Sequence, residues 1–473
     1  MFSNYVETDD LIGILSPGSY SPEILECVRA TKDWERLDGF LGRQPRLGIT
    51  GTIESSYVDA TTPGAVPYIT TKQINDVLVY PKDCKYISTD ADQEWSKCRV
   101  KDGDILICKS GKVGAAGLLR AKGEKNCNSV SDVINVRLRE GCEVDPFFLA
   151  LTFNSPWVRS QLQQQSGGAV FDHVSIYAIP ELKFPACRFE IQAAIGSKIR
   201  KAERLRQIAG NCEREVDGVF QSAVPSYPSV PEIVSWVDTS TLTERMDPQP
   251  YRTHALALLE AIRSIPHGVV EHECQISGGC AVPSDEFLED DGIPLIRIRD
   301  IGERSFDPSG TFVSQDFYAA NSKYAASESE IVVGMDGNFR AQFFLDSDLP
   351  AFINQRVAII QAEGVRAEFL AAWLNRPEGQ IQLYRTSVKT TVEHISLVDI
   401  RNVLFPRFGD GEENRLADLI RANREFIAES SRLVEKAKED VEGLIEGTLN
   451  EDTLLEESAQ IEKWLNDNPT PNS

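Results

Sequence analysis

The chain is 473 residues long, 41% of them hydrophobic and 26% charged, and its formal net charge is −23. This composition is that of a globular protein of several domains, and no apolar run approaches the roughly 20 residues that a membrane-spanning helix needs. The first residues, MFSNYVETDD, have neither the basic start nor the apolar stretch of a secretory signal. We therefore expect a cytoplasmic protein.

The cysteine pattern argues against two further classes of protein. Ten cysteines are scattered along the chain, with no Cys-x-x-Cys pair and no histidine at zinc-finger spacing. Neither a disulfide framework nor a metal site is predicted.

The charge is distributed unevenly. An acidic chain is ordinarily a poor partner for nucleic acid, because its carboxylates repel phosphates. Residues 97–125 nevertheless hold eight basic and three acidic side chains, whereas residues 410–473 hold 7 basic and 17 acidic ones. Because of this basic segment, the net negative charge does not exclude DNA binding as a function.

The first half of the chain predicts short strands followed by helices. Apolar runs predict buried strands at 66–68, 104–108 and 133–136, and a helix is predicted at 146–165. From 186 to 222 apolar residues recur every three or four positions, which predicts a long amphipathic helix. A proline-rich linker at 223–231 ends it.

The second half repeats this order. Strands are predicted at 293–298, 330–333 and 357–360, a helix at 367–385 and a second long helix at 407–448. VPYITTKQI (66–74) returns as IPLIRIRDI (293–301), and DGDILICKSGKVG (102–114) as ESEIVVGMDGNFR (328–340). QLQQQSGGAVFDHVSI (161–176) returns as QLYRTSVKTTVEHISL (382–397), and the offset drifts only from 231 to 221. The chain is therefore an internal duplication.

The duplication predicts an α+β fold with two pseudo-twofold-related globular domains, 1–185 and 223–406. A long helix with one apolar stripe needs a partner, and its own copy is the obvious one, so we expect an antiparallel coiled coil. The acidic tail, 449–473, is expected to be disordered. The stripe residues that we expect to serve the helix pairing and partner binding are Ile195, Ile199, Leu205, Leu419, Phe426 and Val434.

The stretch FNSPWVRSQL (153–162) is close to the Asn-Pro-Pro-aromatic loop with which amino-methyltransferases hold a flipped base. Its first proline is replaced by Ser155, and the second copy has Asn375 at the place of Asn154. We interpret both as helix starts, with Asn as the N-cap and Pro in the first turn. No glycine-rich S-adenosylmethionine loop or Walker loop accompanies them, so no catalytic residue is predicted.

The two hairpin turns are the best candidates for DNA contacts. KSGK (109–112) offers cations and a glycine that allows close approach to a phosphate, and Asn338 with Arg340 has the chemistry that reads adenine and guanine edges. The run of glutamines at 163–165 could read bases in the same way, although such a run is often inert. The candidate DNA contacts are Lys72, Lys109, Ser110, Lys112, Arg120, Lys125, Arg297, Arg299, Asn338, Arg340, Arg385 and Lys389.

Two histidines recur in register, His173 and His394. Each could contact a base or a phosphate, but a histidine between a helix and the last strand more often ties the turn down. We favour the structural role.

Taken together, these motifs resemble the specificity subunit of Type I restriction-modification systems. The first copy shows VPYITTKQI, GDILICKSG, TFNSPWVRSQL and PACRFEIQAAI, and the second shows IPLIRIRDI, AAWLNRPEGQIQL and FPRFGDGEENRL. The second copy departs from the family at SEIVVGMDG and at Asn414, where a glutamine is usual. The resemblance covers roughly residues 15–446.

The resemblance implies a non-catalytic DNA reader with two target-recognition domains, each reading half of a split site. It further implies two methyltransferase subunits docked on the paired helices, methylating adenine N6 with S-adenosylmethionine, and allows a nuclease or translocase subunit. This chain itself would bind no cofactor. Two alternatives stay open: an acidic protein-binding scaffold or DNA mimic, which the charge of −23 favours, and a recognition subunit of a related phage-defence system.

Overall fold

The computed structural model describes residues 7, 11–12, 17–121, 123, 126–166, 173–228, 236–242, 245, 247–389 and 391–469. Its contacts divide the chain into two compact units, residues 1–204 with 430–473, and residues 205–429. The division falls inside the two long helices, so each unit combines one globular domain with segments of both helices. Within the described residues no helix is long and apolar enough to cross a membrane.

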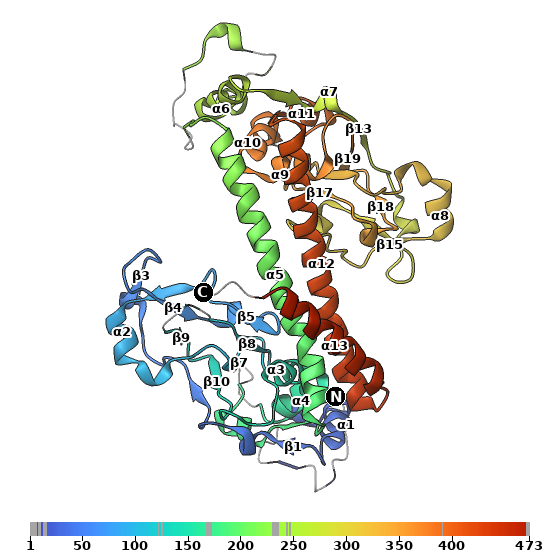
Figure 1. The fold of residues 1–473 in the computed structure, drawn as a ribbon. Helices are drawn as coiled ribbons and strands as arrows, with labels where there is room; N and C mark the ends of the chain where they lie inside the picture. The colour runs from blue at the N-terminus through green and yellow to red at the C-terminus, as the bar shows by residue number, and fades with distance from the viewer. Residues whose placement is uncertain are drawn as a thin grey trace. The chain divides into compact units, whose positions relative to one another are not determined.

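The first unit is built around two sheets (Figure 1). The five-stranded sheet has the order β2-β10-β7-β8-β5 and the four-stranded sheet the order β3-β6-β4-β9. The strands are β1 (Glu35–Arg36), β2 (Arg46–Leu47), β3 (Tyr57–Val58), β4 (Val66–Ile69), β5 (Leu78–Val79), β6 (Lys85–Ile87), β7 (Ile105–Cys108), β8 (Ala116–Leu119), β9 (Asn128–Ser129), β10 (Val133–Val136) and β11 (Lys183–Phe184). The helices are α1 (Pro22–Ala30), α2 (Thr89–Glu94), α3 (Pro146–Asn154) and α4 (Pro156–Gln164).

The second unit has a four-stranded sheet, β13-β19-β16-β17, and a three-stranded sheet, β15-β14-β18. Its strands are β12 (His267–Val269), β13 (Cys274–Gly278), β14 (Ile293–Ile296), β15 (Phe312–Val313), β16 (Ile331–Gly334), β17 (Ala341–Phe343), β18 (Phe352–Ile353), β19 (Val357–Ala362), β20 (Val388–Lys389), β21 (Glu393–His394) and β22 (Leu404–Pro406). Its helices are α6 (Thr253–Arg263), α7 (Val270–Glu273), α8 (Gln315–Ala320), α9 (Ala367–Asn375), α10 (Pro377–Thr386) and α11 (Leu397–Arg401).

The two units share one topology, as the repeat predicts. The antiparallel run β10-β7-β8 corresponds to β19-β16-β17, and both copies contain the same parallel pair, β4 with β9 and β14 with β18. In each, the strand that carries the Phe-Pro pair closes the domain by antiparallel pairing, β11 with β1 and β22 with β12. The predicted strands and the α+β class are confirmed.

Two long helices follow the domains, α5 (Phe189–Ala223) and α12 (Asp410–Glu446). In the second unit Asn423 Nδ2 donates to the Ala209 carbonyl at 2.7 Å, and Arg415 pairs with Glu215. From the first of these contacts to the second, the residue number rises in α5 and falls in α12, so these segments run antiparallel. In the first unit Lys198 of α5 pairs with Asp440 of α12.

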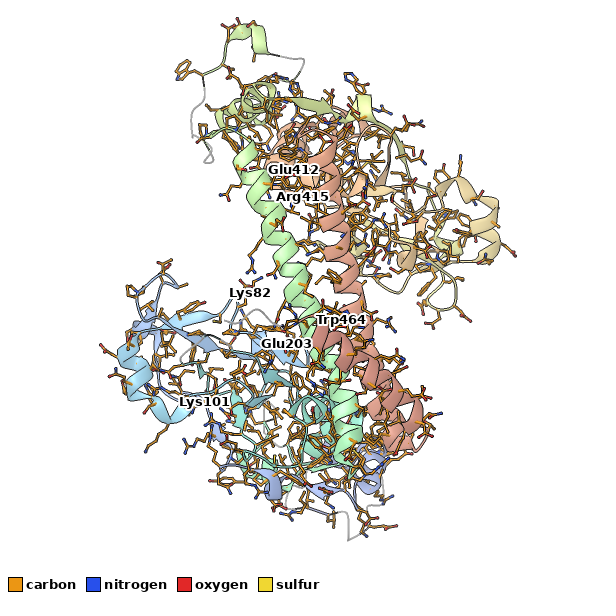
Figure 2. The ribbon with its side chains drawn as sticks, viewed as in Figure 1. Lys82, Lys101, Glu203, Glu412, Arg415 and Trp464 are labelled. Atoms are coloured by element: carbon orange, nitrogen blue, oxygen red, sulfur yellow. The ribbon has the colours of Figure 1, made fainter. Side chains whose placement is uncertain are left out.

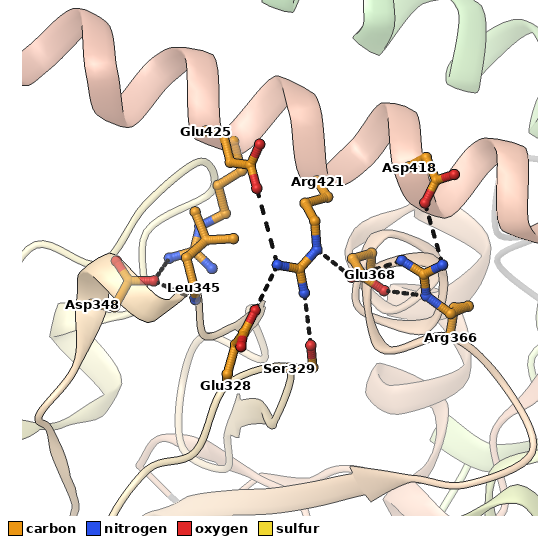
Figure 3. A network of polar contacts seen from close by, with 10 residues as sticks. Glu328, Ser329, Leu345, Asp348, Arg366, Glu368, Asp418, Arg421 and Glu425 are labelled. Atoms are coloured by element: carbon orange, nitrogen blue, oxygen red, sulfur yellow. Dashed lines mark hydrogen bonds and ion pairs between the residues drawn. The ribbon is translucent and has the colours of Figure 1, made fainter.

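Ion pairs fasten α12 to the second domain (Figure 3). The Arg421 guanidinium donates to Glu368 at 2.8 Å, to Glu328 at 2.9 Å and to Ser329 Oγ at 2.7 Å. Glu368, whose side chain is only 2% exposed, also meets Arg366 at 3.1 Å. One arginine of the helix is thus bonded to three separate domain side chains.

The predicted helices at 146–165 and 367–385 are each broken in two. The breaks fall before Pro156 and Pro377, whose rings occupy the first turn of the next helix. Prediction and structure agree on the proline, but the asparagine is not the cap, because Asn154 and Asn375 are the last residues of α3 and α9. Ser155 and Arg376 precede the new helices and make no side-chain cap bond.

The expectation of a disordered tail is wrong for most of its length. Residues Glu451–Asp467 form helix α13, which begins at the side-chain cap of Asn450 and buries Leu454 and Ile461. The acidic composition suggested disorder, but Glu451, Glu457 and Glu462 pair with Arg188, Lys198 and Arg200. The neutralised charge and the two buried apolar residues explain why the segment folds.

Candidate nucleic-acid interface

An asparagine holds the hairpin of each domain against its helices. Asn154 Nδ2 donates to the Ala116 carbonyl at 2.7 Å, and the Ala116 amide donates back to Asn154 Oδ1 at 3.2 Å. Asn375 makes the same pair of bonds with Ala341, at 2.8 Å and 2.9 Å. The side-chain amide therefore pairs with a strand residue as another strand would, and this fixes the hairpin that precedes β8 and β17.

In the first domain three segments meet at the hairpin turn. The Lys109 amide donates to the Asp132 carbonyl at 2.7 Å, and the Val174 amide donates to the Lys109 carbonyl at 3.1 Å. The Ser110 hydroxyl donates to the Asp132 carboxylate. Gly111, at the tip, has φ of +73°, a conformation that favours glycine.

The second domain builds the same junction from other side chains. The Met335 amide donates to the Arg356 carbonyl at 3.1 Å, and the Ile395 amide donates to the Met335 carbonyl at 3.0 Å. The Asp336 carboxylate lies 3.6 Å from the Arg356 guanidinium and contacts His394 Nδ1. His394 thus holds the turn in place through Asp336, which is the structural role favoured from the sequence.

The junctions differ in exposed chemistry although their backbones match. Ser110 and Asp132 in the first copy correspond to Asp336 and Arg356 in the second, so the position that carries a carboxylate in one copy carries a guanidinium in the other. Arg356 is 57% exposed. The sequence alone does not point to Arg356, because only the backbone pairing shows that the residue before β19 lies beside the hairpin.

Several predicted contacts do gather at the first junction. Lys72 and Lys112 are exposed, and both contact Asn75, whose Nδ2 donates to the Lys72 carbonyl at 2.5 Å and whose Oδ1 accepts from the Lys112 ammonium. Lys109 is half-buried, and His173 is exposed. Among the glutamines at 163–165, residue 163 is exposed and residue 164 is buried.

In the second domain the arginines are partly engaged. Arg297 donates to Ser309 Oγ at 2.9 Å and Arg299 to the same oxygen at 2.7 Å, around the fully buried Asp300. Arg299 remains 59% exposed, whereas Arg297 is 23% exposed. Arg299 is therefore the more available of the two for a ligand.

Asn338 and Arg340 line a cavity of about 470 Å³ inside the second unit. Arg340 is held by Glu303 at 3.0 Å, and the α5 residues Glu213 and Asp217 also line the cavity. A smaller cavity of about 260 Å³ lies at the equivalent place in the first unit, with Glu442 of α12 in its wall. Both walls mix carboxylates with cations, which include Arg376 and Arg424 in the second unit and Arg159 and Lys438 in the first.

Two predicted contacts are internal. Arg120 is 11% exposed and donates to Glu203 of α5 (labelled in Figure 2) at 2.7 Å, with Asp102 at 3.3 Å. Arg385 donates to the Pro250 carbonyl at 2.8 Å, and burial, together with the nearby Arg263, lowers its pKa. Both residues were expected to contact DNA, but Arg120 is bonded to carboxylates of its own unit and Arg385 to a backbone carbonyl.

Two further candidates are only partly visible. Lys125 lies outside the described residues. Lys389 belongs to β20, which pairs with β21 opposite Glu393, but its side chain is outside the described part of the chain.

The stripe residues of the long helices are mostly core. Ile195 and Ile199 are fully buried, Leu205 is 2% exposed and Val434 is 4% exposed. Leu419 and Phe426 are half-buried. The first four are therefore closed to an outside partner, which corrects their assignment to partner binding, and a partner subunit would have to meet other faces of these helices.

The described residues contain no cluster of histidine, cysteine and acidic side chains that could hold a metal ion. All ten cysteines are free thiols. Burial raises the pKa of Cys108 to about 11, so this thiol is unreactive at neutral pH.

Fold and junction define a class: a duplicated α+β protein in which each domain presents a hairpin junction and is followed by a long helix. No protein-family model matches the chain. A curated relative, the Type I restriction enzyme EcoBI specificity subunit of Escherichia coli, is 30% identical over 132 residues, which are 28% of this chain and 26% of the relative. The match thus spans about a quarter of the relative's length, and it agrees with the sequence resemblance.

Solved structures give distant likenesses. The Type-I restriction-modification S subunit from M. genitalium has a TM-score of 0.44 at 14% identity, covering 90% of this chain and 96% of that one. The HsdS subunit from Thermoanaerobacter tengcongensis has a TM-score of 0.28 at 14% identity, covering 88% and 97%. The chain is similar to Type I specificity subunits.

Proposed function

We propose that this chain is the sequence-reading subunit of a Type I restriction-modification complex and performs no chemistry itself. The observation that carries the proposal is the repeated junction: one backbone arrangement occurs twice, with different exposed side chains at corresponding positions. A protein that reads two different half-sites needs this combination of constant scaffold and variable surface.

In the proposed complex each domain reads one half of a split DNA site. Lys72, Lys109 and Lys112 contact phosphates, while Asn338 and Arg356 offer the hydrogen-bonding groups that distinguish base edges. Methyltransferase subunits, two by analogy with the family, dock on the chain and supply S-adenosylmethionine and the adenine chemistry. A nuclease or translocase subunit is a further partner that the analogy allows.

The half-sites can be tested by co-expressing the chain with its methyltransferase and mapping methylated adenines across the host genome. We expect one split motif with two different halves. Replacing residues 109–114 with MDGNFR, together with Asp132→Arg, should change only one half. A motif with identical halves, or a change in both halves, would count against the assignment of one domain to each half.

Phosphate contacts can be tested separately by salt dependence. The Lys109→Gln/Lys112→Gln variant should bind every duplex more weakly and lower the slope of log K against log salt by about 2, since each neutralised phosphate contributes about 0.9. Lys101→Gln is the control and should leave the slope unchanged, because this exposed lysine (labelled in Figure 2) precedes β7, whereas the turn follows that strand. If the unaltered complex showed no salt-dependent DNA binding at all, the acidic-scaffold alternative would replace this proposal.

A further inference from the structure

The C-terminal helix α13 lies along the first half of α5 in the first unit. Arg188, directly before α5, meets Glu451 at 2.5 Å, and farther along Arg204 of α5 donates to the carbonyls of Asn468 and Pro469 at 2.8 Å and 2.6 Å. Residue numbers rise together in both helices, so the two run in the same direction.

Between these ends, the ion pairs that the described residues form from α13 to α5 join carboxylates of α13 to cations of α5. Lys198, which is 2% exposed and also pairs with Asp440 of α12, lies 3.1 Å from Glu457. The Lys201 ammonium sits 5.4 Å from the ring centre of Trp464 (labelled in Figure 2). Lys198, Lys201 and Arg204 are spaced by three residues, so they share one side of the helix. This basic stripe, Arg188, Lys198, Lys201 and Arg204, is covered by an acidic helix.

The second copy has no such stripe. With the local offset of 221, the corresponding positions are Gly409, directly before α12, and Leu419, Ala422 and Glu425 within it. A basic stripe that served only the shared fold would be expected in both copies. The stripe and its acidic cover therefore belong to a function of the first unit alone.

α13 is attached weakly for a helix of its length. Only Leu454 and Ile461 of this helix are buried, and the Arg188–Glu451 pair is 64% and 45% exposed. Exposed ion pairs contribute little and are screened by salt. The connection 447–450 includes Gly447, whose φ is +74°, which ends α12 and lets the chain reverse.

We infer that α13 is a displaceable acidic cover on a DNA-binding stripe of α5. This inference rests on the function proposed above. When DNA is bound, phosphates of the duplex take the positions that the carboxylates of α13 occupy in the free chain. In the free chain α13 suppresses binding to arbitrary DNA. Bound DNA backbone displaces it, and the stripe then adds a contact that does not depend on sequence.

The test compares two variants of the full chain with equal changes in charge. The facing variant, Glu451→Gln/Glu457→Gln/Glu462→Gln, removes the acids that meet Arg188 and cations of α5 and α12. The matched control, Glu446→Gln/Glu456→Gln/Asp467→Asn, removes three exposed acids that form no ion pair within the described residues. Binding of a labelled random-sequence duplex is measured by anisotropy over a salt series.

We expect the facing variant to bind the random duplex about tenfold more tightly at low salt, with a slope steeper by 2 to 3 because three or so cations become available. The control should gain less than about threefold. Adding Lys201→Gln/Arg204→Gln to the facing variant should reverse the gain. An equal gain in affinity in both variants would show that net charge alone causes the gain, and this would overturn the inference. If neither variant gained affinity, this would overturn it as well.

A second measurement does not depend on variants. Amide hydrogen exchange of residues 451–469 should speed up when the random duplex is added to the unaltered chain, because displaced helices lose protection. Unchanged or slower exchange would overturn the inference. Either failure would leave the methylation map of the complex intact, so it could be told apart from failure of the proposed function.

Discussion

Asp104 and Glu330 stand at the same position in the two copies, directly before β7 and β16, and both are buried. Asp104 accepts two bonds from the Arg137 guanidinium, each at 2.6 Å. Glu330 meets the neutral Gln361 at 3.0 Å, and burial raises its pKa. One carboxylate is neutralised by a cation, and the other is not.

These environments predict opposite effects of removing the charge. Asp104→Asn leaves Arg137 without its counter-ion and should lower the free energy of unfolding by about 2–4 kcal/mol. Glu330→Gln should raise stability at pH 7. Because the folded pKa is raised, the favourable contribution of Glu330 is complete below its unfolded pKa of about 4.3 and is lost as pH rises through the folded value.

Urea unfolding at pH 4 and pH 7 checks both variants. The gain from Glu330→Gln should shrink toward pH 4, where the carboxyl is already protonated. A gain of the same size at both pH values would show that its cause is not the charge.

Asn154 provides a second prediction at this scale. Its side chain bonds to both backbone groups of Ala116 and also donates to the Ala150 carbonyl at 2.9 Å. Asn154→Ala should therefore cost about 2–3 kcal/mol, more than the roughly 1 kcal/mol of a helix cap. Methylation by the refolded complex should stay within a few-fold of normal, and labelled methyl transfer by the purified chain alone would contradict the structural role.

At the scale of elements, α12 depends on Arg421 for its attachment to the second domain (Figure 3). Burial would raise the pKa of Glu368, but hydrogen bonds from Arg366 and Arg421 lower it below its usual value. A carboxylate with a lowered pKa stabilises the fold above its unfolded pKa, and that contribution is lost as pH falls through the folded pKa.

Arg421→Ala should accordingly destabilise the chain by about 2–3 kcal/mol at pH 7 and by less below about pH 4. Arg415→Ala is the control, since its pairs with Glu412 and Glu215 are exposed (Figure 2) and such pairs contribute at most about 1 kcal/mol. Thermal unfolding at the two pH values measures both. If both variants lost the same stability, the buried network around Arg421 would contribute no more than an exposed ion pair.

For the whole molecule, α5 and α12 are the elements that contribute residues to both compact units. If they set the distance between half-sites, lengthening them should change the gap in the recognised sequence. Four residues inserted after Ala209 and four before Asn423 keep the Ala209–Asn423 contact region in phase and add about 6 Å. The gap should grow by about two base pairs, at about 3.4 Å each, with both halves unchanged.

Methylated-adenine mapping is the readout for this variant as well. Two-residue insertions at the same sites rotate the stripe by about 200° and should abolish assembly with the methyltransferase. If the four-residue variant changed a half-site and kept the gap, the helices would have a purely structural role.

The sequence by itself determined the duplication, the strands and the two long helices. Each of these depends on residues close together in the chain: an apolar run for β7 or β16, a recurrence every three or four positions for α5, and a motif repeated at a nearly constant offset. Local patterns suffice because backbone hydrogen bonding and one-sided burial impose these periods.

Only the tertiary structure decided how the charged and polar side chains are used. Arg120 had the composition of a DNA contact and is bonded to Glu203, 83 positions away. Asn154 had the position of a cap and instead pairs with Ala116, and α13 had the composition of a disordered tail and instead covers α5. A charge attracts any opposite charge that folding brings near, so its partner depends on three-dimensional proximity, which no local pattern records.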